Sequence, residues 1–321
     1  MAPIVDLAQE LIDHILDFLH DDPISLLSSS LVARNWVPAP RYHIFEKIAI
    51  NYYFRPGYQL RLDTANGFLA TCDSPYSTIL PSVHSVVLNI STELDETAAV
   101  LLDEICLVLG RAPINKLLFI DHTYSGKPMS LSRIAPHFSG LQEFAYNALD
   151  DVAEDLFAVV ASFPMLRRLS AYAATPAPHT QLYPSPTAFA YLHTLRLQLS
   201  SHESALSWLQ SADEPLRLET LDLNIFHPYH NGWGPVGALN SLLHASGEHL
   251  RHLSLGVSYK DDIDDDDIDA VFRQMRDADG EVDLSSLANL RTLRLTNHNV
   301  DAICSALASL PVGAQPSRPS G

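Results

Sequence analysis

The chain has 321 residues, of which 47% are apolar, so it is long enough for one large or two ordinary domains with a packed core. Its 38 acidic and 20 basic side chains give a net charge of −18, which argues against a nucleic-acid partner and against an anionic membrane surface. Charged residues make up only 18% of the chain. We therefore expect a chain that buries much of itself or hides surface against a partner.

The first 45 residues predict two short helices that carry more apolar surface than they can bury themselves. At about 100° per residue, the first helix has four apolar residues clustered on one side: Leu7, Leu11, Ile15 and Phe18. Further apolar residues widen this sector to about 180°, against the roughly 100° that a surface helix needs. Leaving three or four such side chains in water forgoes about 5–10 kcal/mol. Either the following repeat or another protein is expected to cover this surface.

From residue 83 onward, the pattern L-x-x-L-x-L recurs eight times with apolar substitutions. The copies begin at residues 83, 114, 141, 166, 192, 218, 250 and 290. Most of their spacings fit or slightly exceed the period of about 20–29 residues of leucine-rich repeats. Helical patterns fall between the copies, over residues 94–109, 151–163, 201–210, 236–244 and 301–310.

Strands and helices that alternate at this period predict an α/β solenoid, with a parallel sheet on the concave face and helices on the convex face. The repeats lack a fixed asparagine, so we expect an irregular leucine-rich-repeat domain. An ordinary α/β sheet with leucine-rich strands is the alternative. The predicted organisation is a helical module over 1–50, a linker over 51–80, the repeat domain over 81–310 and a disordered tail over 311–321.

The last long interval between repeats contains an acidic insertion. Residues 261–269 hold seven aspartates in nine positions and predict a solvated surface segment. A second interpretation is attraction of a basic partner, which raises the association rate at low salt. The neighbouring residues do not match a calcium-binding loop, because its first and twelfth positions lack carboxylates.

Residues between the ladder leucines are expected to face the ligand surface of the solenoid. A Pro/Gly-rich loop over 226–235 adds aromatic side chains, which are frequent binding anchors on loops. The candidate substrate-binding residues are Tyr172, Arg196, Asp222, Asn224, Phe226, Tyr229, Trp233 and Arg294.

Sequence motifs for catalysis, metals and cofactors are absent. There is no G-x-S-x-G elbow, no HExxH and no complete phosphate-binding loop, and the fifteen histidines show no metal-ligand spacing. We therefore expect neither an enzyme nor a metal or cofactor site. The sparse cysteines, Cys72, Cys106 and Cys304, predict reduced thiols, and no signal peptide or membrane span is apparent. These features predict a cytoplasmic or nuclear protein.

The segment Leu7–Phe45 resembles an F-box. That family opens with Leu-Pro-x-Glu-[Leu/Ile/Val] and continues with Ile-[Leu/Phe]-x-x-Leu, which read here as residues 7–11 and 15–19. Residues 31–36, Leu-Val-Ala-Arg-Asn-Trp, match the signature of the second half, and 41–45 are similar to the end of many fungal F-boxes. Ala8 replaces the usual proline, which suits a first helical turn, so we expect softer helix initiation and a lower affinity.

The resemblance, and the familiar succession of F-box and leucine-rich repeats, implies a substrate-recognition adaptor of an SCF-type cullin–RING ubiquitin ligase. The F-box is then expected to dock on a Skp-type linker, and through it on a cullin, while the repeats hold a protein substrate. A leucine-rich-repeat scaffold that is not linked to ubiquitin is the alternative. The residues that the resemblance assigns to linker binding, some of them also core, are Leu7, Glu10, Leu11, Ile15, Leu16, Leu19, Leu26, Leu27, Leu31, Val32 and Trp36.

Overall fold

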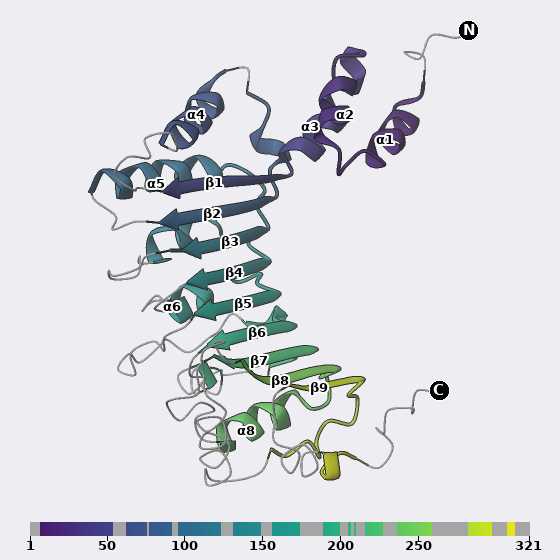
Figure 1. The fold of residues 1–321 in the computed structure, drawn as a ribbon, viewed down its shortest axis with the longest axis vertical. Coiled ribbons are helices and arrows are strands. Elements are labelled where there is room, and N and C mark those ends of the chain that lie inside the picture. Colours follow the sequence, from purple (N-terminus) through teal and green to yellow (C-terminus); the bar gives the residue numbers. More distant parts are fainter. Residues whose placement is uncertain are drawn as a thin grey trace. The chain divides into compact units, whose positions relative to one another are not determined.

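A computed structural model describes most of the repeat strands and the helices near the N-terminus (Figure 1). The described residues are 7–53, 62–75, 77–91, 96–122, 131–148, 156–173, 189–199, 205–206, 209, 216–226, 236–258, 282–296 and 307–311. The chain divides into two compact units, 1–119 and 120–321. None of the helices within the described ranges is long and apolar enough to span a membrane.

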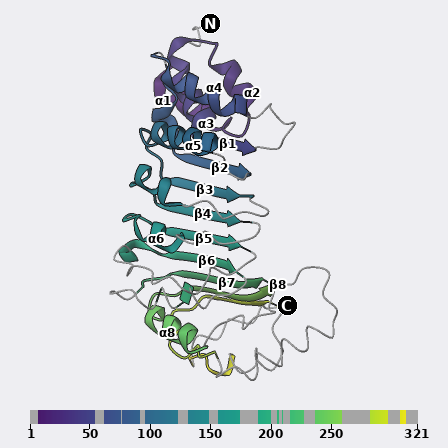
Figure 2. The ribbon, with the colours of Figure 1, turned by 90° about the vertical axis from the view of Figure 1, so that its left-hand side faces the viewer.

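The strands form a nine-stranded sheet whose strand order follows the chain order. Every pairing with a described register is parallel, as the predicted solenoid-like α/β fold requires. Figure 2 shows this succession of strands from a second direction. The strands are β1 (Lys47–Tyr53), β2 (Ser85–Ser91), β3 (Lys116–Asp121), β4 (Glu143–Ala148), β5 (Arg168–Ala173), β6 (Thr194–Leu199), β7 (Thr220–Phe226), β8 (His252–Ser258) and β9 (Thr292–Thr296).

The predicted leucine ladder forms the core of the repeats. In the second unit, Leu169 lies beside Leu195, which is followed in register by Leu221, Leu253 and Leu293. The ladder positions of the first seven copies are buried. Those of the last copy are only half-buried, and β9 is the last strand in the strand order of the described residues.

Helices connect several of the strands. The predicted helices at 94–109, 151–163 and 236–244 are confirmed by α5 (Glu96–Leu109), α6 (Leu156–Ala161) and α8 (Val236–Ser246). Each buries apolar side chains, and the Phe144 ring of β4 lies 5.6 Å from the Phe163 ring that follows α6. In the ranges 201–210 and 301–310, the structure describes only a few residues, of which 205, 206, 209, 307 and 308 are helical.

The first unit also contains elements that the sequence analysis did not predict. β1 lies at the boundary between the predicted helical module and linker, and α4 (Leu62–Asp73) lies inside the predicted linker. Ahead of them are α1 (Gln9–Asp17), α2 (Pro23–Ser29), the 3₁₀ helix η2 (Arg34–Trp36) and α3 (Pro38–Phe45). The acidic insertion at 261–269 and residues 312–321 of the predicted tail lie outside the described residues.

Candidate functional site

The helical segment, residues 7–45, has a small core of its own. Ile12 and Leu16 of α1, Leu26 of α2 and Trp36 of η2 are buried against one another. The residues that pack half-buried around these four are Leu7, Leu19, Ala33, Ala39 and Ile44.

Local sequence explains where the helices of this segment begin. Pro23 occupies the first turn of α2, where a missing N–H costs nothing. The Ile24 and Ser25 N–H groups donate to Asp22 Oδ1 at 3.2 and 3.1 Å, and the Ser25 hydroxyl donates to Oδ2. The Ser25 hydroxyl, followed by the two N–H groups, lowers the pKa of the Asp22 carboxyl. By contrast, Ala8 precedes α1 without any side-chain cap.

Polar contacts join the helices of the helical segment to one another and to the residues that follow it in the first unit. The His43 ring of α3 pairs with the Asp17 carboxylate of α1 at 3.0 Å. The Arg41 guanidinium donates to the Thr78 hydroxyl. The N–H groups of His84 and Ser85 donate to the Glu46 carbonyl at 3.0 and 2.9 Å, which joins the end of α3 to the start of β2.

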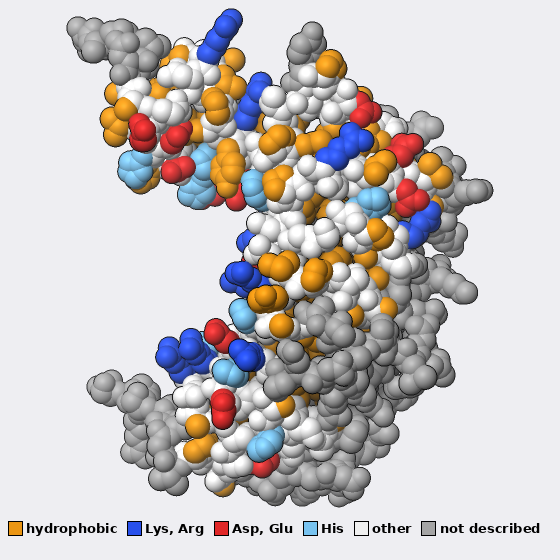
Figure 3. Space-filling model, turned by 180° about the vertical axis from the view of Figure 1, so that it is seen from behind, with side chains coloured by type: hydrophobic (Ala, Val, Ile, Leu, Met, Phe, Trp, Pro, Cys, Tyr) orange, Lys and Arg blue, Asp and Glu red, His pale blue; other side chains and the backbone are white. Residues whose placement is uncertain are grey.

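Besides Tyr42, seven aliphatic or phenylalanine side chains of the helical segment remain exposed to solvent. Phe18, Ile24 and Leu31 are 76%, 77% and 86% exposed. We call this set the apolar surface; it consists of Leu11, Ile15, Phe18, Ile24, Leu27, Leu31 and Val32. Figure 3 shows exposed hydrophobic side chains on the outside of this part of the first unit. A core of four residues cannot cover so many side chains, so the surface is available to a partner.

The residues that the sequence assigned to linker binding divide into three groups. Leu11, Ile15, Leu27, Leu31 and Val32 belong to the apolar surface, and the side chain of Glu10 is exposed beside them on α1. Leu7 and Leu19 are half-buried, whereas Leu16, Leu26 and Trp36 are buried in the small core.

Two members of the apolar surface were not assigned from the sequence. The helical period already placed Phe18 beside Leu11 and Ile15, and this periodicity was the signal that could have identified it. Ile24 follows Pro23 in the first turn of α2, where the F-box pattern names no residue. Neither position is singled out by the family resemblance.

The substrate-binding candidates lie on the exposed face of the sheet where the structure describes them. Arg196 lies in register with Asp222 on the next strand, and Tyr172, Asn224 and Arg294 also point away from the buried ladder. Asn224 covers the neighbouring strand closely, because a Cβ atom on Gly256 would lie 2.1 Å from its Oδ1 atom. Phe226 ends β7, but its side chain, together with Tyr229 and Trp233, lies outside the described residues.

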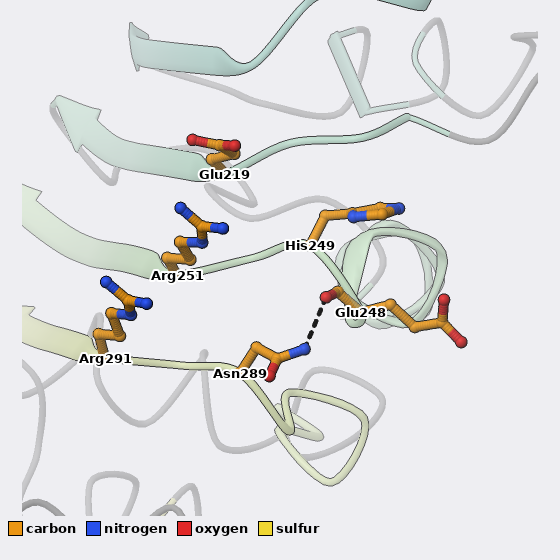
Figure 4. A pocket seen from close by; sticks show the side chains of 6 residues that line it. All are labelled: Glu219, Glu248, His249, Arg251, Asn289 and Arg291. Carbon is orange, nitrogen blue, oxygen red and sulfur yellow. Dashed lines mark hydrogen bonds between the residues drawn. The ribbon is translucent and has the colours of Figure 1, made fainter.

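A polar hollow of about 190 Å³ opens where β7, β8 and β9 begin (Figure 4). Asn289 closes one part of it by donating from Nδ2 to the Glu248 carbonyl at 2.8 Å. The sequence analysis named none of its residues, although Glu219, Arg251 and Arg291 each directly follow the first leucine of a repeat copy, just before the strand begins. The side chains that line it are Glu219, Glu248, His249, Arg251, Asn289 and Arg291.

The described thiols, Cys72 and Cys106, are free and differ in burial. Burial raises the pKa of the Cys106 thiol to about 12, and the nearby Asp103 adds to this effect, so that Cys106 carries almost no thiolate at neutral pH. Cys72 is free and half-buried. Within the described ranges, no three His, Cys, Asp or Glu side chains lie together as a metal site would require.

Comparison with known proteins leaves the family of this chain open. No family model and no curated protein matches the sequence. Among solved structures, the chain is similar to a crystal structure of a Bacteroides fragilis protein determined as a structural genomics target. The identity is 12%, the TM-score is 0.34, and the match covers 77% of this chain and 74% of that one. A similarity of this size carries no information about function.

Proposed function

We propose that the chain is a substrate-recognition adaptor of an SCF-type cullin–RING ubiquitin ligase. In this proposal, the helical segment docks on a Skp-type linker protein, and the repeats hold a protein substrate. The observation that carries it is the apolar surface, whose seven exposed side chains lie within the segment that resembles an F-box.

The composition of the apolar surface favours a protein partner. Burying each of its side chains is worth roughly 1–2 kcal/mol, since most of them are about half exposed or more. Charged side chains such as Glu10, Asp13 and Arg34 lie in the same segment and supply the polar rim that protein interfaces commonly have. Because the core beneath is only four residues, docking would also stabilise the segment by mass action.

As an adaptor, this chain would position the substrate and would not take part in the chemical step. A substrate held by the repeats, while the helical segment is bound to the linker, meets the ubiquitin-charged enzyme at a high effective concentration. The attack of a substrate amine then becomes effectively intramolecular. No ionisable group of this chain is required to take part in the reaction.

The proposal is tested by calorimetric titration of the purified full chain with a Skp-type linker. Leu27→Asp combined with Leu31→Asp places two charges on the apolar surface, at side chains that contribute little to the core. We expect the affinity to fall by about 100-fold or more, because the charges must be buried without partners. Leu107→Asp on α5 is the matched control, since Leu107 is 55% exposed outside the helical segment.

We expect the control to bind within about twofold of wild type, and equal circular-dichroism melting curves to show that all variants fold. Absence of binding by the wild-type chain would overturn the adaptor proposal and favour a repeat scaffold that is not linked to ubiquitin. Unchanged binding by the double variant would show that the linker uses another surface.

A further inference from the structure

Arginines are concentrated on the described repeats of the second unit. Between residues 156 and 296, the described residues include seven arginines, no lysine and four acidic residues, although the whole chain has a net charge of −18. All seven side chains are exposed. We call them the arginine surface; they are Arg167, Arg168, Arg196, Arg217, Arg251, Arg291 and Arg294.

The repeat register brings two of these arginines, Arg251 and Arg291, together where β8 and β9 begin. The Arg251 N–H donates to the Glu219 carbonyl at 2.9 Å, and the Arg291 N–H donates to the Arg251 carbonyl at 2.8 Å. Arg251 and Arg291 therefore lie on neighbouring strands, about 4.8 Å apart along the sheet. Figure 4 shows their side chains extending in the same direction beside the polar hollow, and Figure 3 shows basic side chains gathered along this edge.

Among the described residues, no ion pair neutralises the charge of Arg251 or of Arg291. Within the described part of the second unit, the ion pair found among these arginines joins Arg168 to Glu143 at 2.8 Å. Neither Arg251 nor Arg291 has an ion pair with a described acidic side chain, although Glu219 lies at the same hollow. Like charges on adjacent strands disfavour folding. An anionic partner that contacts both guanidinium groups would relieve this repulsion.

We propose that the arginine surface binds an acidic segment of another protein, with Arg251 and Arg291 as its centre. Guanidinium groups bind carboxylates through paired, charge-assisted hydrogen bonds, which lysines do not provide. A peptide is favoured over a nucleic acid, because a chain of net charge −18 repels a long polyanion. If the proposed function holds, the protein that carries this acidic segment is a ubiquitination substrate. The binding of the segment does not rest on that function and requires no linker.

The test measures fluorescence anisotropy of a labelled twelve-residue peptide of alternating Glu and Ser, titrated with the full chain alone at low salt. We expect Arg251→Gln combined with Arg291→Gln to weaken binding by about tenfold or more, and a Gln/Ser peptide to bind at least about tenfold more weakly. The matched control is Lys47→Gln combined with Arg111→Gln, which removes the same charge from exposed sites in the first unit. We expect this control to bind within about twofold of wild type.

Equal melting curves show that the variants fold. If the Arg251→Gln, Arg291→Gln variant does not fold, Arg196→Gln combined with Arg294→Gln on the exposed sheet face is used in its place. We expect this second variant to lose about threefold or more in peptide affinity. No binding of the acidic peptide, an equal loss in the control, or tighter binding of an oligothymidylate of the same charge would each overturn the proposal. Because the linker is absent from the assay, failure of the adaptor proposal would leave this result unaffected.

Discussion

Leu16 and Leu27 are leucines in neighbouring helices of the first unit, but only Leu16 is buried. Leu16→Ala removes buried methyl groups from a four-residue core and is expected to destabilise the helical segment by about 2–4 kcal/mol. Leu27→Ala at an exposed site is expected to change stability by less than about 0.5 kcal/mol. Hydrogen exchange of the α1 and α2 amides measures both effects. Equal protection in the two variants would show that the segment does not depend on this core.

Gly247, just after α8, is required by a close approach of the backbone. A Cβ atom there would lie 2.5 Å from the Ser286 carbonyl oxygen, which belongs to the backbone before β9 and cannot rotate away. We expect Gly247→Ala to destabilise the second unit by about 1–3 kcal/mol. Gly67→Ala in α4 is the control, since nothing lies within 4 Å of its added Cβ atom, and it is expected to be neutral or to stabilise by up to about 1 kcal/mol. Urea titration of both variants checks this difference.

At the scale of the element, α2 depends on a titratable cap. The pKa of Asp22 in the folded chain lies below its ordinary value of 3.8, so its stabilising contribution is present above that value and is lost as the pH falls through the folded pKa. Asp22→Asn keeps an oxygen acceptor without the charge. We expect this variant to melt below wild type at pH 7 and to approach it below pH 3.8. A difference that grows toward acid would contradict the assignment of the cap.

The sequence predicted the repeats better than it predicted the first unit. Eight ladder copies were located because stacking makes every repeat bury the same positions, which leaves a period in the sequence. β1 was missed because residues 1–50 were assigned to the helical module, although Phe45, Ile48 and Ile50 fit the spacing of the pattern and Ile50 is buried like a ladder residue. α4 was missed because its Asn66-Gly67 pair is typical of a turn.

The division of the helical segment into core and surface could not be predicted from periodicity. When apolar residues occupy about half of a helix circumference, the period does not tell which side is buried. Leu16 and Leu11 were therefore assigned together, and the structure separates them. The arginine surface was missed for a different reason: its members are far apart in sequence and become neighbours only through the strand register.

At the scale of the whole molecule, the two proposed binding surfaces belong to different compact units. We expect Leu27→Asp combined with Leu31→Asp to leave peptide affinity within about twofold of wild type, and Arg251→Gln combined with Arg291→Gln to leave linker affinity equally unchanged. Titrating the leucine variant with the acidic peptide, and the arginine variant with the linker, tests whether the two surfaces are independent. A cross effect of about tenfold or more would reveal an energetic coupling between the units.

The parallel register of the sheet also constrains how such a chain can evolve. Each repeat must return the next strand to the same alignment, so a residue added within a strand would turn its leucines toward solvent. A residue added between strands leaves the alignment intact. The late repeats, which begin at 218, 250 and 290, are spaced more widely than those at 166 and 192, and the surplus lies between strands whose registers still match. The strand register is thus the part of this molecule that tolerates no insertion, whereas the connections between strands can lengthen.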